Sequence, residues 1–282
     1  MGATNGTIRA GVMGWPVSHS LSPRLHGFWL DRYGIDGTYE ALPVEPDQVH
    51  DRLRTLAADG FAGTNVTVPH KEAALAAVDR VTDRARRIGA VNTVVAEADG
   101  TLSGDNTDGF GFLENLKDHA PDWRADGGPA VVLGAGGAAR AIVAALVDNG
   151  APDVRLVNRT LSRAETLAMD IGGPVTAVPW DQLAQSLDGA GLLVNTTSLG
   201  MAGKSPLEIA LSSLPAAALV TDIVYTPLMT GLLQAAAANG NPIVDGIGML
   251  LHQARPGFAA WFGVEPEVDD GLRRHVLAGL DS

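Results

Sequence analysis

The stretch Ala130–Arg140, which reads A-V-V-L-G-A-G-G-A-A-R, decides the fold. Its first four residues are apolar, as expected of a buried strand, and Gly134, Gly136 and Ala139 follow at the G-x-G-x-x-G/A spacing. From Ala138 to Val147 the apolar residues recur at helical spacing. A strand, a glycine turn and a helix in this order favour a dinucleotide-binding unit, because the turn lets the backbone approach a pyrophosphate at the helix N-terminus. An ordinary glycine-rich turn between strand and helix is the alternative.

Strands and helices continue to alternate after this stretch. Five further strands are predicted, separated by helices that include Leu161–Ile171 and Thr230–Asn239, at Asp153–Val157, Val175–Val178, Leu192–Asn195, Leu219–Ile223 and Pro242–Val244. Six strands joined by crossovers, beginning at the glycine turn, indicate a Rossmann-type, doubly wound dinucleotide-binding domain. We place this domain at residues 108–242, with a helix at Asp108–His119 joining it to the preceding segment.

The end of the second of these strands bears on the choice of cofactor. An NAD site is expected to carry Asp or Glu there, to hold the ribose 2′-hydroxyl. This chain instead has Asn158-Arg159-Thr160, with Arg163 one turn further. Because two guanidinium groups suit a 2′-phosphate, the sequence favours NADP over NAD. Surface arginines that bind no ligand are the alternative.

The first 107 residues also alternate between strands and helices, which predicts a mostly parallel α/β sheet covered by helices. Strands are expected near Ile8–Met13, Thr38–Val44, Gly63–Val68, Ala90–Ala96 and Leu102–Gly104. Helices are expected near Ser22–Tyr33, Pro46–Ala58, His70–Val78 and Thr82–Ile88. The first of these helices is expected to have Ser22 as its N-cap and Pro23 as its first residue, the preferred pair at those positions.

Two helices are predicted at the end of the chain, at Met249–Phe262 and Asp269–Gly279. Because the six-strand unit is complete before them, we expect them to pack on the first segment. The predicted substrate domain is therefore residues 1–107 completed by residues 243–282. Pro256 lies inside the first of these helices and is expected to kink or shorten it. Gln253 is polar in an apolar stretch, so it needs a hydrogen-bond partner if it is buried.

Three polar stretches in the first segment lie at the ends of predicted elements. Ser18–Ser22 brings hydroxyls next to a helix N-terminus, which suits a carboxylate, although a solvated loop with a plain cap is the favoured explanation when the stretch is taken alone. Asn65–Lys71 ends with a lysine at a helix start, where a cation is unfavourable unless it has a partner or a task; a surface lysine is the alternative. Gly104–Gly109 contains Asp and Asn residues that turn formation or capping would also explain.

Composition argues against several kinds of function. The net charge of −12 is unfavourable for a nucleic-acid or anionic-membrane partner, and no apolar run approaches a membrane span. The chain has no cysteine, and its histidines form no H-E-x-x-H or comparable pair, so we expect no metal site. A soluble cytoplasmic protein is the simplest interpretation. The sequence leaves open whether it is a monomer or a homodimer.

Seven motifs taken together resemble the shikimate dehydrogenase family over nearly the whole chain. In chain order they are S-H-S-L-S-P, N-V-T-V-P-H-K, G-A-V-N-T, G-D-N-T-D-G, G-A-G-G-A-A-R, N-R-T and D-G-I-G-M-L-L-H-Q-A. The resemblance implies NADP-dependent interconversion of shikimate and 3-dehydroshikimate, a step on the route to chorismate and the aromatic amino acids.

The resemblance also implies roles for individual residues. By motif position, the substrate carboxylate would be bound by Ser20 and Ser22 with help from Tyr225, and the ring hydroxyls would be contacted by Thr67, Lys71, Asn92, Asp108 and Gln253. The cofactor would be lined by Asp83, Gly134, Ala135, Gly136, Gly137, Ala138, Asn158, Arg159, Thr160, Arg163, Ile223 and Gly246. Oxidation of a secondary alcohol needs a proton acceptor. Our hypothesis is that Lys71 is the main acid and base and that Asp108 orients and polarises.

Two alternative functions stay open at this point. A quinate/shikimate dehydrogenase of broader specificity is the nearest one, although quinate-accepting relatives tend to have Thr at the position of Ser22 and an acid in place of Asn158-Arg159. A non-catalytic sensor that binds NADP without chemistry is the other. The presence of both Lys71 and Asp108 argues against a sensor.

Overall fold

The computed structural model describes residues 7–280, which divide into two compact units. The first unit consists of the residues up to Thr107 together with those from Gln253 onward, and the middle unit is Asp108–His252. From the sequence, the chain was expected to re-enter the first domain at residue 243, whereas in the structure residues 243–252 belong to the middle unit. The outer ends of the predicted ranges, residues 1–6 and 281–282, lie outside the described residues.

The first unit contains a six-stranded sheet in the order β2-β1-β3-β5-β6-β4. The strands are β1 (Ile8–Gly14), β2 (Gly37–Pro43), β3 (Phe61–Val66), β4 (Arg80–Val81), β5 (Thr93–Ala96) and β6 (Leu102–Asp105). Strand β1 pairs in parallel with β2 and β3, and β4 pairs in parallel with β6, whereas β5 is antiparallel to both of its neighbours. The two-residue strand β4 was not predicted.

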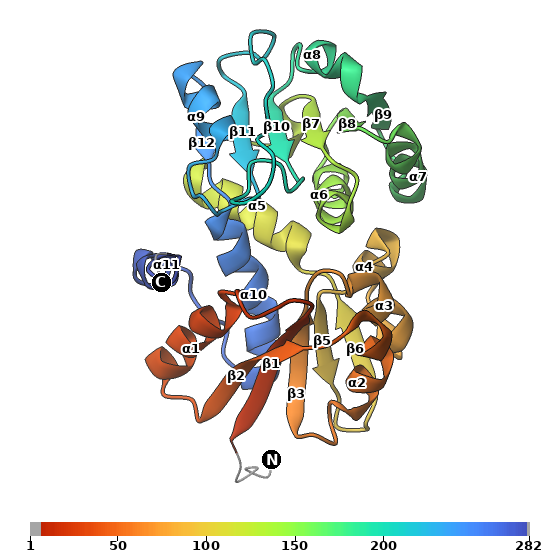
Figure 1. Cartoon of the computed structure of the whole chain (residues 1–282), viewed down its shortest axis with the longest axis vertical. Coiled ribbons are helices and arrows are strands. Elements are labelled where there is room, and N and C mark those ends of the chain that lie inside the picture. The colour runs from red at the N-terminus through yellow and green to blue at the C-terminus, as the bar shows by residue number, and fades with distance from the viewer. Residues whose placement is uncertain (1–6, 281–282) are drawn as a thin grey trace. The chain divides into compact units, whose positions relative to one another are not determined.

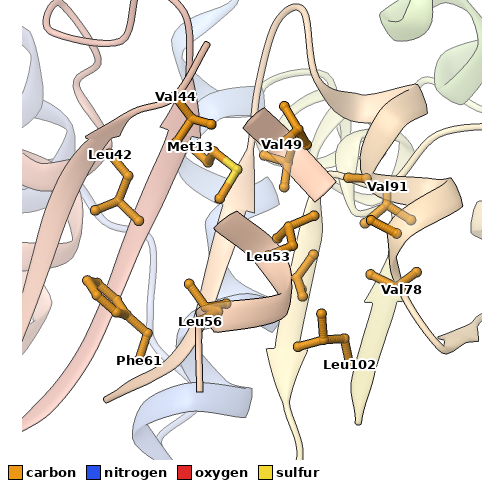
Figure 2. Close-up of a cluster of buried hydrophobic side chains, with 14 of the residues drawn as sticks. Met13, Leu42, Val44, Val49, Leu53, Leu56, Phe61, Val78, Val91 and Leu102 are labelled. Carbon is orange, nitrogen blue, oxygen red and sulfur yellow. The ribbon is translucent and has the colours of Figure 1, made fainter. Parts of the chain in front are cut away.

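Helices cover both faces of this sheet (Figure 1). The helices of the first unit are α1 (Ser22–Tyr33), α2 (Val49–Thr55), α3 (Lys71–Ala77), α4 (Asp83–Ile88), the part of α10 (Ile247–Phe262) from Gln253 onward, and α11 (Asp270–Leu277). Figure 2 shows one face, where α2 contributes Leu53 to a buried apolar cluster with Met13, Phe61 and Leu102 from the strands. Each such fully buried aliphatic side chain stabilises the fold by about 1.5–3 kcal/mol.

An aromatic cluster joins α1 and α10 to β2 in the same unit. The His26 ring stacks on Tyr39 with centroids 3.7 Å apart, and Phe258 and Trp261 lie within 6 Å of the same ring. Trp261 also donates its indole N–H to the carbonyl of Val94 at 3.0 Å. These contacts place the second half of α10 against the sheet of the first unit, as expected.

The middle unit has a six-stranded, fully parallel sheet in the order β12-β11-β10-β7-β8-β9. The strands are β7 (Ala130–Leu133), β8 (Val154–Asn158), β9 (Val175–Pro179), β10 (Leu192–Asn195), β11 (Leu219–Asp222) and β12 (Ile243–Val244). The strand order reverses between β7 and β10, which is the doubly wound arrangement. The predicted α/β fold class with a Rossmann-type nucleotide domain is confirmed.

The helices of the middle unit lie on both faces of its sheet (Figure 1). They are α5 (Asp108–His119), α6 (Gly137–Asp148), α7 (Leu161–Ile171), α8 (Leu183–Ser186), α9 (Gly231–Ala238) and the first part of α10. Short 3₁₀ turns lie at η2 (Ala125–Gly127) and η3 (Trp180–Gln182) in this unit and at η1 (Pro46–Gln48) in the first unit. Helix α5 packs closely on α6, because Gly109 leaves room for Ala141 and Ala145. None of the helices among residues 7–280 has the length and apolar character needed to cross a membrane.

The structure differs from two local expectations, the N-cap of α1 and the shortening of α10 at Pro256. Helix α1 has Leu21 as its N-cap and Ser22 as its first residue, so Ser22 does not cap it. Instead, the Ser20 hydroxyl accepts the backbone N–H of Ser22 at 3.3 Å. Helix α10 continues through Pro256 to Phe262 and is not shortened. Proline removes one backbone donor from a helix, and this apolar helix tolerates that loss.

Candidate active site and cofactor pocket

The glycine turn that defines the fold lines a pocket of about 290 Å³ in the middle unit. Gly134 has φ of +106°, which disfavours other residues, and a Cβ there would lie 2.8 Å from Thr196 Oγ1. Gly136 is the N-cap of α6, and a Cβ at that position would meet no atom within 4 Å. The space in front of Gly136 is therefore open, beside the N-terminus of a 12-residue helix that favours an anion.

The wall opposite the glycine turn is the loop that follows β10. The side chain of Asn195, the last residue of β10, holds the turn at the start of this loop. The Asn195 Oδ1 atom accepts the N–H of Thr197 at 3.0 Å and its hydroxyl at 2.7 Å, and Asn195 Nδ2 donates to the Leu199 carbonyl at 3.1 Å. Thr196, Thr197 and Leu199 then line the pocket.

A buried carboxylate holds Asn195 in turn. Asp222, at the end of β11, is fully buried and accepts hydrogen bonds from Asn195 Nδ2 at 2.9 Å, from the Val224 N–H at 3.0 Å and from the Thr230 hydroxyl at 2.8 Å. Burial raises the pKa of Asp222 to about 6, although these three donors favour its charged form. This carboxylate ties β10, the loop after β11 and the start of α9 together beneath the pocket.

Two arginines lie at the pocket without a carboxylate partner. Arg159 and Arg163 both line it and are both exposed, and neither forms an ion pair or hydrogen bond with any residue in the range 7–280. In contrast, Arg124, Arg140 and Arg155 of the same unit are paired with Asp126, Asp170 and Asp153. Two unpaired guanidinium groups beside a glycine turn form a receptor for an anion such as a phosphate.

The predicted cofactor residues do not all gather at this pocket. Gly134, Ala135, Gly136, Asn158, Arg159 and Arg163 line it. Gly137 and Ala138 form the first turn of α6, and Thr160 is the N-cap of α7, where its carbonyl accepts a hydrogen bond from Asn158. Ile223 and Gly246 lie close together, because a Cβ on Gly246 would be 2.6 Å from the Ile223 carbonyl. Asp83 is the first residue of α4, in the first unit.

Backbone hydrogen bonds bring the predicted substrate residues of the first unit to one edge of its sheet. The Thr67 N–H donates to the Met13 carbonyl at the end of β1, and the Val66 N–H donates to the carbonyl of Asn92. The Lys71 carbonyl accepts the N–H of Val91, one residue before Asn92. Thr67, Lys71 and Asn92 are therefore neighbours, although they belong to three different segments.

Side-chain contacts add Gln253 to this group. Asn92 Nδ2 donates to Gln253 Oε1 at 3.4 Å, and Thr107 Oγ1 donates to the Gln253 carbonyl at 2.8 Å. Lys71 is half-buried at the first position of α3, whereas Asn92 is buried. Asp108 is buried at the first position of α5 in the middle unit, directly after Thr107 in the chain.

Three of the predicted substrate-binding hydroxyls are not used by the protein itself. The side-chain oxygens of Ser22, Thr67 and Tyr225 form no hydrogen bond with the described part of the chain. Ser22 is nonetheless 95% buried, with 5% of its surface exposed. Tyr225 is half-buried in the middle unit, and burial raises the pKa of its hydroxyl. Hydroxyls that have no partner within the protein are free to hydrogen-bond a polar ligand.

A larger cavity of about 640 Å³ lies elsewhere in the middle unit. It is lined by Trp123, Arg124 and small residues near the amino ends of β7, β10 and β11, and none of the predicted site residues contributes to it. Doubly wound sheets bind ligands at the carboxyl ends of their strands. The smaller pocket at the glycine turn is therefore the better candidate for the cofactor.

Sequence reasoning missed several residues that shape these sites. Trp180 lines the pocket from η3, and no pattern around it pointed there. Asp222 and Thr107 act through contacts with residues distant in the chain. Thr107 stood inside the G-D-N-T-D-G motif, and that was the one signal available for it.

The comparisons with known proteins agree with this geometry. The family model described as the shikimate dehydrogenase substrate binding domain matches residues 12–94. A second family model, described as shikimate / quinate 5-dehydrogenase, matches residues 119–223. The chain belongs to the shikimate dehydrogenase family. The NADP(+) shikimate dehydrogenase of Rhodospirillum rubrum is 62% identical over 272 residues, covering 95% of this chain and 96% of that protein. The corresponding protein of Paramagnetospirillum magneticum is 61% identical over 269 residues, covering 95% and 98%.

Solved structures of the shikimate dehydrogenase family share the fold over the whole length. The Thermus thermophilus shikimate 5-dehydrogenase in complex with NADP(H) and shikimate has a TM-score of 0.86 and 40% identity, covering 97% of this chain and 100% of that chain. Quinate dehydrogenase from Corynebacterium glutamicum in complex with NAD has a TM-score of 0.87 and 31% identity, covering 96% and 99%. One of these neighbours therefore binds NADP(H) with shikimate and the other binds NAD, and in such a shared fold particular residues decide which ligand is bound.

Proposed function

We propose that this protein interconverts shikimate and 3-dehydroshikimate with NADP, as a step in chorismate and aromatic amino acid biosynthesis. The observation that carries the proposal is the pair of unpaired arginines, Arg159 and Arg163, at a pocket formed by the glycine turn. The chain's close similarity to NADP(+) shikimate dehydrogenases supports it. The NAD complex of the quinate enzyme makes cofactor choice the property to test.

The pocket residues fit NADP. Arg159 and Arg163 would hold the 2′-phosphate, and the glycine turn with the N-terminus of α6 would hold the pyrophosphate. The open space in front of Gly136 leaves room for a phosphate group against the backbone. When bound, the nicotinamide accepts or donates the hydride.

In our proposal the hydroxyls of Ser20, Ser22 and Tyr225 bind the substrate carboxylate, and Thr67, Asn92 and Gln253 hydrogen-bond the ring hydroxyls. The lack of an internal partner for Ser22, Thr67 and Tyr225 supports these roles. The Ser20 hydroxyl accepts one backbone N–H and retains its own proton to donate. A site whose side chains hydrogen-bond the polar groups of the substrate rejects analogues that lack those groups, so these contacts give the site its specificity.

We assign the proton transfer to Lys71 and Asp108. Alcohol oxidation releases the hydroxyl proton together with the hydride, so a base must accept that proton. Lys71 is the proposed proton acceptor, at its Nζ atom, and Asp108 orients and polarises the reacting hydroxyl. The half-buried position of Lys71 beside Asn92, which is assigned to a ring hydroxyl, supports this role.

The proposal is tested by cofactor selectivity. Arg159→Ala should raise the KM for NADP⁺ roughly ten- to hundredfold, because a charge-assisted hydrogen bond to phosphate is lost. The KM for NAD⁺, which has no 2′-phosphate, should change by no more than about twofold. Both are read from shikimate-dependent formation of reduced nicotinamide by its near-ultraviolet absorbance.

Arg124→Ala is the matched control, since Arg124 is an exposed arginine of the same unit that is paired with Asp126. Equal losses for NADP⁺ and NAD⁺ in Arg159→Ala would refute the role of Arg159. Wild-type turnover of quinate at a rate similar to that of shikimate would favour the enzyme of broader specificity.

Action in the cytoplasm, as a monomer or a homodimer, stays a prediction from the sequence.

A further inference from the structure

A chain of buried hydrogen bonds runs through the first unit beneath the residues assigned to the substrate. Tyr39 Oη donates to Asn65 Oδ1 at 2.6 Å, and Asn65 Nδ2 donates to Thr93 Oγ1 at 3.3 Å. The Thr93 hydroxyl then donates to Asn92 Oδ1 at 2.9 Å. All four of these residues are buried. Because buried polar groups are costly to leave unpaired, such a chain fixes the orientation of each member.

The chain ends at Thr107, which is completely buried. Asn92 Nδ2 donates to the Thr107 hydroxyl at 3.1 Å, and the backbone N–H of Thr107 donates to Asn92 Oδ1 at 2.9 Å. A hydroxyl has a single proton, and the shortest contact of Thr107 Oγ1 to an acceptor is the Gln253 carbonyl at 2.8 Å. In this arrangement Thr107 accepts from Asn92 and donates to Gln253.

We propose that Thr107 is a positioning residue for substrate recognition, which holds Asn92 and Gln253 in the orientation that binds the ring hydroxyls. This inference rests on the proposed function, since Asn92 and Gln253 are substrate residues only within it. Thr107 forms hydrogen bonds with both the oxygen and the nitrogen of the Asn92 side chain, and its hydroxyl donates to the backbone carbonyl of Gln253. These two residues come from segments 161 positions apart in the chain.

Thr107→Val keeps the shape of the side chain and removes the hydroxyl. It should lower kcat/KM for shikimate roughly ten- to hundredfold, since a buried donor of Asn92 and the carbonyl of Gln253 each lose a partner. The KM for NADP⁺ should stay within about twofold, because the cofactor residues do not contact Thr107. Thr107→Ser, which keeps the hydroxyl, should retain most of the activity with shikimate.

Thr64→Val is the matched control for a merely structural effect. Thr64 is also completely buried in the first unit, and its hydroxyl lies 2.8 Å from the Asn65 carbonyl and 3.0 Å from the Gly11 carbonyl, so it contacts the backbone and no side chain of the buried hydrogen-bond chain. This variant should lower the unfolding midpoint as Thr107→Val does, with kinetic constants near those of the wild type. If Thr107→Val fails to fold, Thr107→Ala and Thr107→Ser form a second pair that differs only in the hydroxyl.

A double-mutant cycle shows whether Thr107 acts through Asn92. Adding Thr107→Val to Asn92→Ala should cost much less than Thr107→Val costs alone, because the side chain to be positioned is already absent. Additive losses, or a Thr107→Val enzyme with wild-type kcat/KM for shikimate, would overturn the inference while leaving the proposed function intact. Wild-type protein without shikimate turnover would overturn both.

Discussion

Lys71 is the side chain whose removal separates chemistry from binding in the proposed reaction. Lys71→Ala should lower kcat about 10²- to 10⁴-fold, the usual contribution of a general base, and should leave the Kd for shikimate nearly unchanged. Steady-state kinetics and equilibrium titration of shikimate measure the two effects. Lys117→Ala, which removes an exposed lysine paired with Glu114 at 2.7 Å, is the control. Unchanged turnover in Lys71→Ala would refute the assignment.

At the scale of residues, a short motif was enough to predict which side chains lie at the pocket of the middle unit. Arg159 and Arg163 follow a strand at a fixed distance from the glycine turn, so their place at the pocket could be predicted. The N-cap of α1 was predicted wrongly at Ser22, because the residue at which the helix begins depends on how the preceding loop enters α1. The contacts of Asp222 and Thr107 arise only when distant segments meet.

At the scale of elements, the strand–turn–helix unit of β7 and α6 contains two glycines with different tasks. Gly134→Ala should destabilise the fold by about 1–3 kcal/mol, since its φ is +106° and the new Cβ would crowd Thr196 and Thr197. Gly136→Ala has no such clash and should change stability less, yet it should weaken NADP binding by filling the space in front of the backbone. Chemical denaturation and cofactor titration measure the two effects. Equal stability of the two variants would contradict this division.

The elements themselves were predicted best where the pattern is long. All six strands of the middle unit were expected close to their observed positions, because buried parallel strands are continuous apolar runs. The two-residue strand β4 and the four-residue helix α8 show no periodicity and were missed. Pro256 does not shorten its helix, because the packing of an apolar helix can outweigh one lost hydrogen bond.

At the scale of the whole molecule, Asp222 makes stability depend on pH. Its pKa is about 6 in the folded protein against an ordinary value of 3.8, so the folded state binds the proton more tightly. Its contribution to the free energy of unfolding should therefore fall as the pH rises from about 4 to 6, and then stay constant. The total fall is about 3 kcal/mol.

Asp222→Asn tests this dependence, because the amide has no charge to bury and the Thr230 hydroxyl can turn to accept its N–H. Relative to this variant, the wild type should be more stable at pH 5 than at pH 7.5, as measured by urea denaturation at both values. Both proteins share the carboxylates whose pKa is lowered, such as Asp99 and Asp269, so the effect of these groups on the free energy of unfolding cancels in the difference between the two proteins. The same difference at both pH values would contradict the prediction.

The unpaired arginines at the glycine turn have a practical consequence for handling the protein. Arg159 and Arg163 are exposed guanidinium groups in a chain of net charge −12, so they form a local site for small oxyanions on an otherwise acidic molecule. Inorganic phosphate or sulfate in a purification or assay buffer would occupy that site and compete with the dinucleotide. A zwitterionic sulfonate or Tris chloride buffer is therefore the sounder medium in which to measure how tightly the coenzyme is held.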